Sequence, residues 1–214
     1  MVGLIFSAMI GSRACGYNRD NSDYDLRVIY AANLDDIFGL DRLKETDVTR
    51  TDQFEIESHE IKKFIGMLLK SNPNSIETLF SPVQIHHDDR YWDELRELGK
   101  ACITQDMIPA YEGLSHTLIK RANASTGAEK VKTINVLHRN LLTCLYMVMY
   151  GEIEINLRKL KDAFGHSIAD DWEQTAYELL DEIKTFPTKI PAHISDETRK
   201  RANDLLLTIR YDSL

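Results

Sequence analysis

The spacing of the apolar residues changes at Glu60, and this change constrains the fold more than any other feature. Before it, residues 23–30 and 52–58 alternate apolar with polar side chains, as half-buried strands do. After it, apolar residues recur three and four positions apart, beginning with Ile61, Phe64 and Ile65, which is typical of an amphipathic helix. Strands in the first part of the chain and helices in the rest predict an α+β fold, with a small sheet domain followed by a helical domain.

Further elements can be placed from local signals. Residues 4–10 form a short apolar run bounded by glycine, as expected of a central strand. Pro73 disfavours helix at the residue before it, so one helix stops at Ser71 and Asn72, and another begins with Asn72 as its N-cap. Residues 31–50 are predicted to hold a helix and loops, and residues 86–89 a surface loop. Later helices are predicted at residues 91–98, 107–123, 131–148, 156–164, 171–186 and 196–211.

Composition narrows the class of protein. The 214 residues are 43% hydrophobic and 28% charged, which is ordinary for a globular chain. A net charge of −8 argues against a dedicated nucleic-acid coat protein, although a local basic groove remains compatible with it. Three widely spaced cysteines argue against a zinc site and fit a reducing cytoplasm. The apolar N-terminal segment is short and lacks a basic start, so it predicts a buried strand and no membrane association.

Carboxylates gather on two of the predicted strands. In the segment IGSRACGYNRDNSDYDLRVIY, residues 10–30, Asp23 and Asp25 share one face of a strand. Glu55 and Glu57 share one face of the next alternating segment. If these strands are neighbours, three or four carboxylates project from one side of the sheet. Such a cluster is suited to Mg²⁺ in phosphoryl or nucleotidyl transfer, where two ions need bridging oxygen ligands.

A glycine turn lies beside this cluster in the chain. Gly11 and Ser12 follow the first predicted strand directly. Glycine lets backbone N–H groups approach phosphate oxygens without a Cβ in the way. The turn and the carboxylates together predict a site for a metal-bound phosphate ester.

The same residues carry a family resemblance. The pattern GS…SDYDLRVIY, with Asp23 eleven positions after Ser12, resembles the signature of the DNA polymerase beta nucleotidyltransferase superfamily. The full string from Gly11 to Tyr30 resembles one branch, the predicted nucleotidyltransferases associated with RNA repair. IKKFIGMLLKSNPNSIETLFSP, residues 61–82, also fits that branch. So do the later residues Lys132, Arg139 and Gly151.

The resemblance covers most of the chain and implies its organisation. Residues 1–82 would form a small mixed-sheet nucleotidyltransferase domain like the polymerase beta palm, and residues 83–214 a helical domain. Relatives often carry a helix before the first strand, and the comparison with them predicts that this helix is missing or reduced here.

The resemblance also implies a metal site. Asp23 and Asp25 would hold two Mg²⁺ ions, and Glu55 would supply the third catalytic carboxylate. The family usually has aspartate at the third position, and glutamate reaches one carbon further. Glu57, on the same face, is therefore the reserve candidate.

Nucleotide contacts follow in the same way. Gly11 and Ser12 would contact the β- and γ-phosphates of a nucleoside triphosphate, with Arg13 beside them. Lys132 and Arg139, seven residues apart on one helix face, would flank the nucleotide; the alternative is a solvated helix face.

The resulting prediction is a cytoplasmic, Mg²⁺-dependent enzyme that moves an NMP from an NTP to a hydroxyl group. Family association favours an RNA 3′ end, tRNA included, as the acceptor. The acidic net charge favours a protein side chain or a small molecule instead. A catalytically inactive module that binds nucleotide or RNA is the third possibility.

Overall fold

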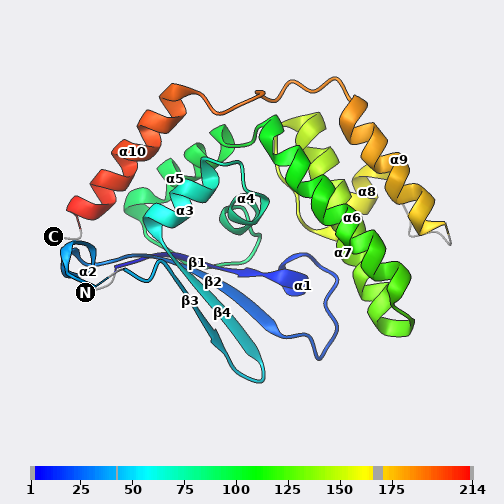
Figure 1. Cartoon of the computed structure of the whole chain (residues 1–214), viewed down its shortest axis with the longest axis horizontal. Coiled ribbons are helices and arrows are strands. Elements are labelled where there is room, and N and C mark those ends of the chain that lie inside the picture. Colours follow the sequence, from blue (N-terminus) through cyan, green and yellow to red (C-terminus); the bar gives the residue numbers. More distant parts are fainter. Residues whose placement is uncertain (1–2, 42, 166–170, 213–214) are drawn as a thin grey trace. The chain divides into compact units, whose positions relative to one another are not determined.

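A computed structural model of the chain describes residues 3–41, 43–165 and 171–212. These residues form two compact units (Figure 1). The first falls within Met1–Ala14, Asn18–Cys102 and Ile194–Leu214, and the second within Cys15–Tyr17 and Ile103–His193. The predicted division into functional domains 1–82 and 83–214 stays a prediction. The unit that contains the sheet also includes segments beyond residue 82.

The first unit contains a mixed sheet. Within the described residues its strands lie in the order β3 (Thr46–Arg50), β4 (Phe54–Glu60), β2 (Tyr24–Ala31), β1 (Gly3–Ile10) and β5 (Gln84–His87). Strands β2 and β4 run parallel, and the other neighbours run antiparallel. The predicted α+β class with a small mixed sheet is confirmed.

Helices cover one face of this sheet. Helix α3 (Ile61–Leu68) packs against β2 and β4, and α4 (Pro73–Leu79) packs against β1 (Figure 1). Helices α5 (Asp89–Ala101) and α10 (Asp196–Tyr211) pack against each other. In addition, α5 packs against α4, and α10 packs against α3. Edge-to-face contact between Phe6 and Phe64, with ring centroids 5.2 Å apart, joins the sheet to α3. The fully buried side chains of this core include those of Phe6, Ile29, Ile61, Phe64, Leu68, Ile76, Leu79 and Leu95.

The charged side of β2 is the side that the helices cover. On this side of the strand, Arg27 and Ile29 are buried, and Asp25, nearer the start of the strand, is half-buried. The carboxylate therefore lies toward the end of the sheet, where access to water persists, while the rest of the same face belongs to the core.

Two strands were not expected. Residues 31–50 contain a short helix, α2 (Leu34–Phe38), as predicted, but they also contain β3. Residues 84–87 form β5, which corrects the expected surface loop at residues 86–89. Both strands lie at the sheet edges and are largely exposed. An edge strand is held by backbone pairing, so its side chains need not alternate.

The predicted start of α4 is confirmed, and α10 has a cap of the same kind. Asn72 caps α4 by accepting a hydrogen bond from the N–H of Asn74, with Pro73 in the first turn. Ser195 caps α10 by accepting from the N–H of Thr198 at 3.1 Å. These caps satisfy N–H groups that a helix start otherwise leaves without partners.

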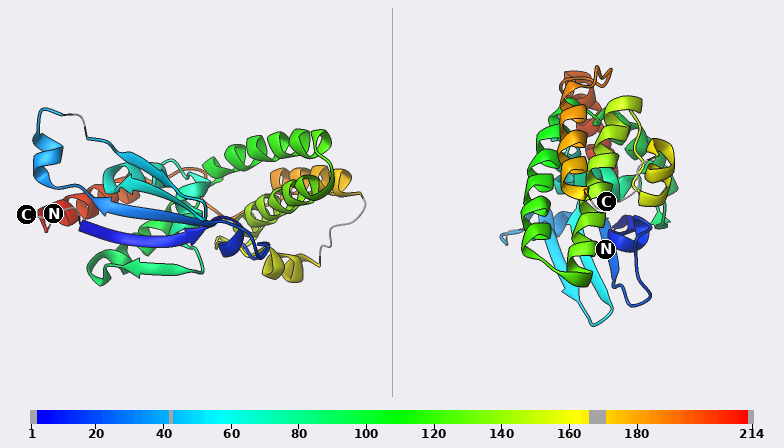
Figure 2. Two further views of the ribbon diagram at one scale, coloured as in Figure 1. Left: turned by 90° about the horizontal axis from the view of Figure 1, so that it is seen from below. Right: turned by 90° about the vertical axis from the view of Figure 1, so that its right-hand side faces the viewer.

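The second unit is helical. Its described elements are η1 (Gln105–Met107), α6 (Ile108–Ala124), α7 (Gly127–Tyr150), α8 (Leu157–Phe164) and α9 (Trp172–Thr185). Helix α7 packs against α6, α8 and α9, and the views of Figure 2 show α6, α7 and α9 running side by side. Each of these α-helices matches a predicted one within a few residues. Among the described helices, none has the length and apolar character needed to cross a membrane.

Candidate active site

The glycine turn lies directly against Asp25. Strand β1 ends at Ile10, which pairs with Asp25 of β2, and Gly11 opens the short helix α1 (Gly11–Ala14). Gly11 has φ +68°, and a Cβ placed on it would lie 1.9 Å from Asp25 Oδ2. A side chain is therefore excluded twice, by backbone conformation and by the carboxylate. Only glycine lets the backbone of the turn approach Asp25 this closely.

A second carboxylate lies opposite Asp25 on the neighbouring strand. In the parallel pairing of β2 with β4, Asp25 is in register with Glu55, and Arg27 with Glu57. Partners in register point to the same side of the sheet. The two acidic strands are therefore neighbours, which was the condition for their carboxylates to share one side of the sheet. Asp23 precedes β2 and is exposed.

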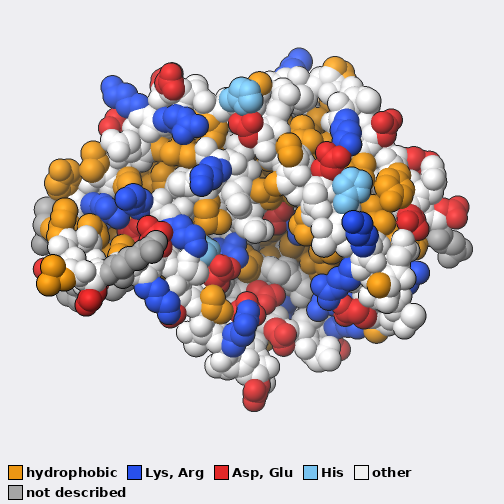
Figure 3. All heavy atoms as spheres, in the orientation of Figure 1, with side chains coloured by type: hydrophobic (Ala, Val, Ile, Leu, Met, Phe, Trp, Pro, Cys, Tyr) orange, Lys and Arg blue, Asp and Glu red, His pale blue; other side chains and the backbone are white. Residues whose placement is uncertain are grey.

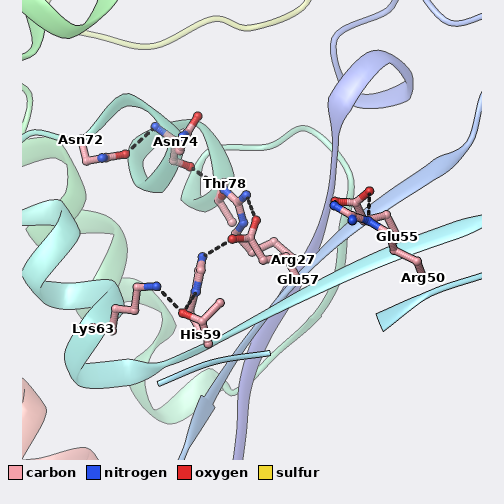
Figure 4. Close-up of polar contacts among 10 residues, drawn as sticks. Arg27, Arg50, Glu55, Glu57, His59, Lys63, Asn72, Asn74 and Thr78 are labelled. Carbon is pink, nitrogen blue, oxygen red and sulfur yellow. Dashed lines mark hydrogen bonds and ion pairs between the residues drawn. The ribbon is translucent and has the colours of Figure 1, made fainter. Parts of the chain in front are cut away.

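Glu55 is held by an exposed arginine. Arg50, its register partner on β3, donates from Nε to Oε2 at 2.9 Å and from Nη2 to Oε1 at 3.1 Å (Figure 4). The hydrogen bonds from Arg50 lower the pKa of Glu55 below its ordinary value, so the carboxylate is ionised at neutral pH. Exposed ion pairs contribute little stability, and another cation can therefore replace Arg50 at little cost.

Glu57 has a different environment. It forms an ion pair with Arg27, whose Nη1 also donates to Thr78 Oγ1 of α4 at 3.1 Å (Figure 4). Its other oxygen lies 3.2 Å from Nε2 of His59. Arg27 is buried, so moving Glu57 onto a metal would leave a buried guanidinium without its carboxylate. This geometry favours Glu55 over Glu57 as the third carboxylate, although the metal assignment itself stays a prediction.

His59 extends the polar network beneath the helices. Its Nδ1 lies 3.2 Å from Oγ1 of Thr46, and that hydroxyl also contacts Nζ of Lys63 (Figure 4). Burial lowers the pKa of His59, opposed by the negative charge of Glu57. The neutral ring therefore links β3 to the Arg27–Glu57 pair. Sequence reasoning missed this residue because a histidine on a strand gives no sign of its partners.

Arg13 holds the loop before Asp23. Its Nε and Nη2 donate to the carbonyl oxygen of Ser22 at 3.1 and 2.7 Å. Its guanidinium lies 3.9 Å from the centroid of the Tyr24 ring. These contacts fix the chain just before β2, and contact of Arg13 with a nucleotide stays a prediction.

Lys132 and Arg139 belong to α7 of the helical unit. Lys132 is exposed, whereas Arg139 is buried. The two residues thus differ in access to solvent despite sharing a helix face. Their contact with a nucleotide at the sheet stays a prediction.

The residues at the sheet have the chemistry of a Mg²⁺ site, but they are not gathered as a complete one. Within the described part of the chain, no three His, Cys, Asp or Glu side chains lie close enough together to hold a metal ion. Asp25 and Glu55 supply carboxylate oxygens, the ligands that Mg²⁺ prefers, and Gly11 leaves space that a Cβ would fill. A cavity of about 650 Å³ elsewhere in the unit, lined by Tyr30 and Lys44 among others, includes none of the predicted site residues.

The mixed sheet, the glycine turn and the neighbouring acidic strands fit the polymerase beta nucleotidyltransferase superfamily, to which a family comparison assigns the chain. A sequence profile of the RNA repair pathway DNA polymerase beta family (RlaP) matches residues 1–202. The chain belongs to this family.

Two individual proteins are similar to the chain. The uncharacterized protein YcgL of Bacillus subtilis (strain 168) is 28% identical over 159 residues, which are 71% of this chain and 59% of that protein. The chain thus spans less than two thirds of the length of YcgL. A solved nucleotidyltransferase-like protein from Exiguobacterium sibiricum 255-15 aligns with 99% of this chain and 69% of its own, at 11% identity and a TM-score of 0.30.

Proposed function

We propose that the protein transfers an NMP from an NTP to a hydroxyl group, with pyrophosphate as the leaving group, and that an RNA 3′ end is the acceptor. The observation that carries this proposal is the approach of the Gly11 turn to Asp25, with Glu55 in register on the next strand. Membership of a family associated with RNA repair supports RNA as the acceptor class.

Each side chain then has a defined task. Asp23, Asp25 and Glu55 would hold Mg²⁺, and the backbone of Gly11 and Ser12 would donate to the β- and γ-phosphates. Bound Mg²⁺ lowers the pKa of the attacking hydroxyl and offsets the charge of the phosphates. The close approach of the Gly11 backbone to Asp25 would bring phosphate donors beside one carboxylate, and the other two carboxylates would move onto the metal as substrate binds.

In this proposal Arg50 is the partner of Glu55 before the metal binds. In the absence of substrate it neutralises Glu55, and Glu55 would exchange Arg50 for the metal when nucleotide binds. Because both side chains are exposed, the exchange leaves no buried charge unpaired.

The test is label transfer from α-³²P-NTPs in the presence of Mg²⁺, total RNA and a protein extract. Asp25→Asn should reduce transfer by roughly 10²–10³-fold, the scale of losing one preorganised electrostatic contact in an active site. Asp93→Asn, at an exposed position of α5, is the matched control and should retain full transfer. Equal transfer by wild type and Asp25→Asn would overturn the assignment. Label on protein or on a small molecule would replace RNA as the acceptor while leaving the enzyme class intact.

A further inference from the structure

Two aromatic rings are stacked at the end of the sheet that carries the candidate site. Tyr24 of β2 and Phe54 of β4 are in register, with ring centroids 5.2 Å apart and an interplanar angle of 22°. The Arg13 guanidinium lies over the Tyr24 ring. Tyr24 thus contacts a cation and a ring, while Phe54 ends the stack and is 40% exposed.

The exposed ring is held in place by its backbone. The N–H of Phe54 donates to Thr51 Oγ1 at 3.1 Å, and its carbonyl accepts from the N–H of Thr51 at 2.8 Å. On the other side, the N–H of Tyr24 donates to the carbonyl of Gln53 at 2.8 Å. These hydrogen bonds fix the backbone of the turn between β3 and β4 at the residue that carries the ring. A ligand that stacks on Phe54 therefore has little backbone motion to restrict.

The stack adjoins the candidate carboxylates in the chain. The register pair Tyr24–Phe54 directly precedes the pair Asp25–Glu55. Alternation along the strands puts the rings on one face and the carboxylates on the other, one residue apart. A strand of nucleic acid that ends near Asp25 can therefore pass the ring of Phe54 as it rounds this end of the sheet.

We propose that Phe54, supported by Tyr24, stacks a base of the single-stranded nucleic acid whose 3′ end is the acceptor; this inference rests on the proposed function and deepens it. Nucleobases of every sequence present a π face to an aromatic ring. The hydrogen bonds from Arg13 to carbonyl oxygens leave its positive charge available to a nearby phosphate. Figure 3 shows acidic and basic side chains interspersed around the tip of the β3–β4 hairpin.

The experiment measures binding of a 5′-fluorescein-labelled single-stranded 12-nucleotide RNA by anisotropy, with Mg²⁺ and without NTP. Phe54→Ala should raise Kd by roughly 5- to 150-fold, the range found when one base-stacking ring is removed. Phe54→Trp should restore binding, because indole stacks at least as well. Phe38→Ala, at an exposed phenylalanine of α2, is the matched control and should bind as wild type does.

Stability is measured on the same variants by thermal unfolding. If Phe54→Ala unfolds at a lower temperature than wild type, Phe54→Leu is used instead. Leucine keeps the apolar bulk without the π face, so this variant should bind RNA more weakly than wild type does. In the label-transfer assay, Phe54→Ala should raise KM for RNA and leave KM for NTP unchanged. Loss of a purely structural contact would not be expected to affect KM for RNA alone.

The outcomes separate the two proposals. Unchanged RNA binding by Phe54→Ala or Phe54→Leu would overturn the stacking site, and so would a wild-type protein that does not bind the RNA. The wild-type protein could instead bind RNA in a way that depends on Phe54 and yet transfer no label. That result would overturn the proposed function and support the stacking site.

Discussion

Asp25 Oδ2 lies 1.9 Å from the point where a Cβ on Gly11 would stand. The antiparallel pairing of β1 with β2 creates this approach, because it places Ile10 opposite Asp25 and so ends β1 beside the carboxylate. The steric part of the requirement for glycine at position 11 is thus a consequence of sheet register, and the positive φ is a second, separate reason. Neither reason depends on what the turn binds.

Gly11→Ala is the direct test of this relationship. The backbone at φ +68° costs a residue with a Cβ about 1–2 kcal/mol, and the clash with Asp25 adds to it. In an Asp25→Ala background the contacts with Oδ2 and Cγ are gone and only the Cβ of residue 25, 3.0 Å from the added Cβ, remains, so the same substitution should cost less. Urea unfolding of the four proteins measures the difference.

Gly66 is the matched control for that cycle. It lies inside α3 with open space where a Cβ would point, so Gly66→Ala should be neutral or stabilise the protein by up to about 1 kcal/mol. Equal costs of Gly11→Ala in both backgrounds would show that Asp25 does not limit the turn.

The two glutamates of β4 should separate in their effects. Glu57→Gln removes the carboxylate from Arg27, whose side chain is only 10% exposed, and should destabilise the protein by about 2–3 kcal/mol. Glu55→Gln breaks an exposed pair and should change stability little, yet it should abolish label transfer. Urea midpoints and transfer assays are the measurements. Loss of activity with intact stability in Glu57→Gln would make Glu57 the third carboxylate.

Much of the fold could be predicted because burial leaves a pattern in the sequence. The alternation in β2 and β4 marks them as strands, although the helices cover their charged face, and the helical spacing after Glu60 records which side chains face the core. Pro73 marked a helix start without any tertiary information. Strands β3 and β5 left no such record, because they pair through the backbone at the sheet edges and expose most side chains.

The candidate site was predictable only in part. Asp25 and Glu55 could be assigned to one side of neighbouring strands, but their register depends on parallel pairing across thirty residues, which no local signal sets. Arg50 escaped prediction because β3 itself did. The distinction between Glu55 and Glu57 followed only from their partners, an exposed arginine in one case and a buried one in the other.

Stability should fall on mild acidification through His59. Burial lowers its pKa in the folded state below the ordinary value of 6.5, so below about pH 6.5 the unfolded chain binds a proton that the folded protein resists. The free energy of unfolding should therefore decrease as pH falls from 6.5 toward 5.5, by at most about 1.4 kcal/mol per pH unit.

Urea unfolding across this pH range measures the slope, and His59→Asn should flatten it. A slope that survives His59→Asn would assign the effect to another group.

Arg50 should compete with Mg²⁺ for Glu55. Its two hydrogen bonds occupy both carboxylate oxygens, so Arg50→Gln should free them for a cation. The Mg²⁺ concentration for half-maximal thermal stabilisation in the presence of NTP should then fall by up to about fivefold, as expected for loss of an exposed ion pair. Lys44→Gln breaks the exposed Lys44–Asp47 pair instead and should leave the Mg²⁺ requirement unchanged. A higher Mg²⁺ requirement in Arg50→Gln would mean that Arg50 orients Glu55 toward the metal, because losing a competitor cannot weaken metal binding.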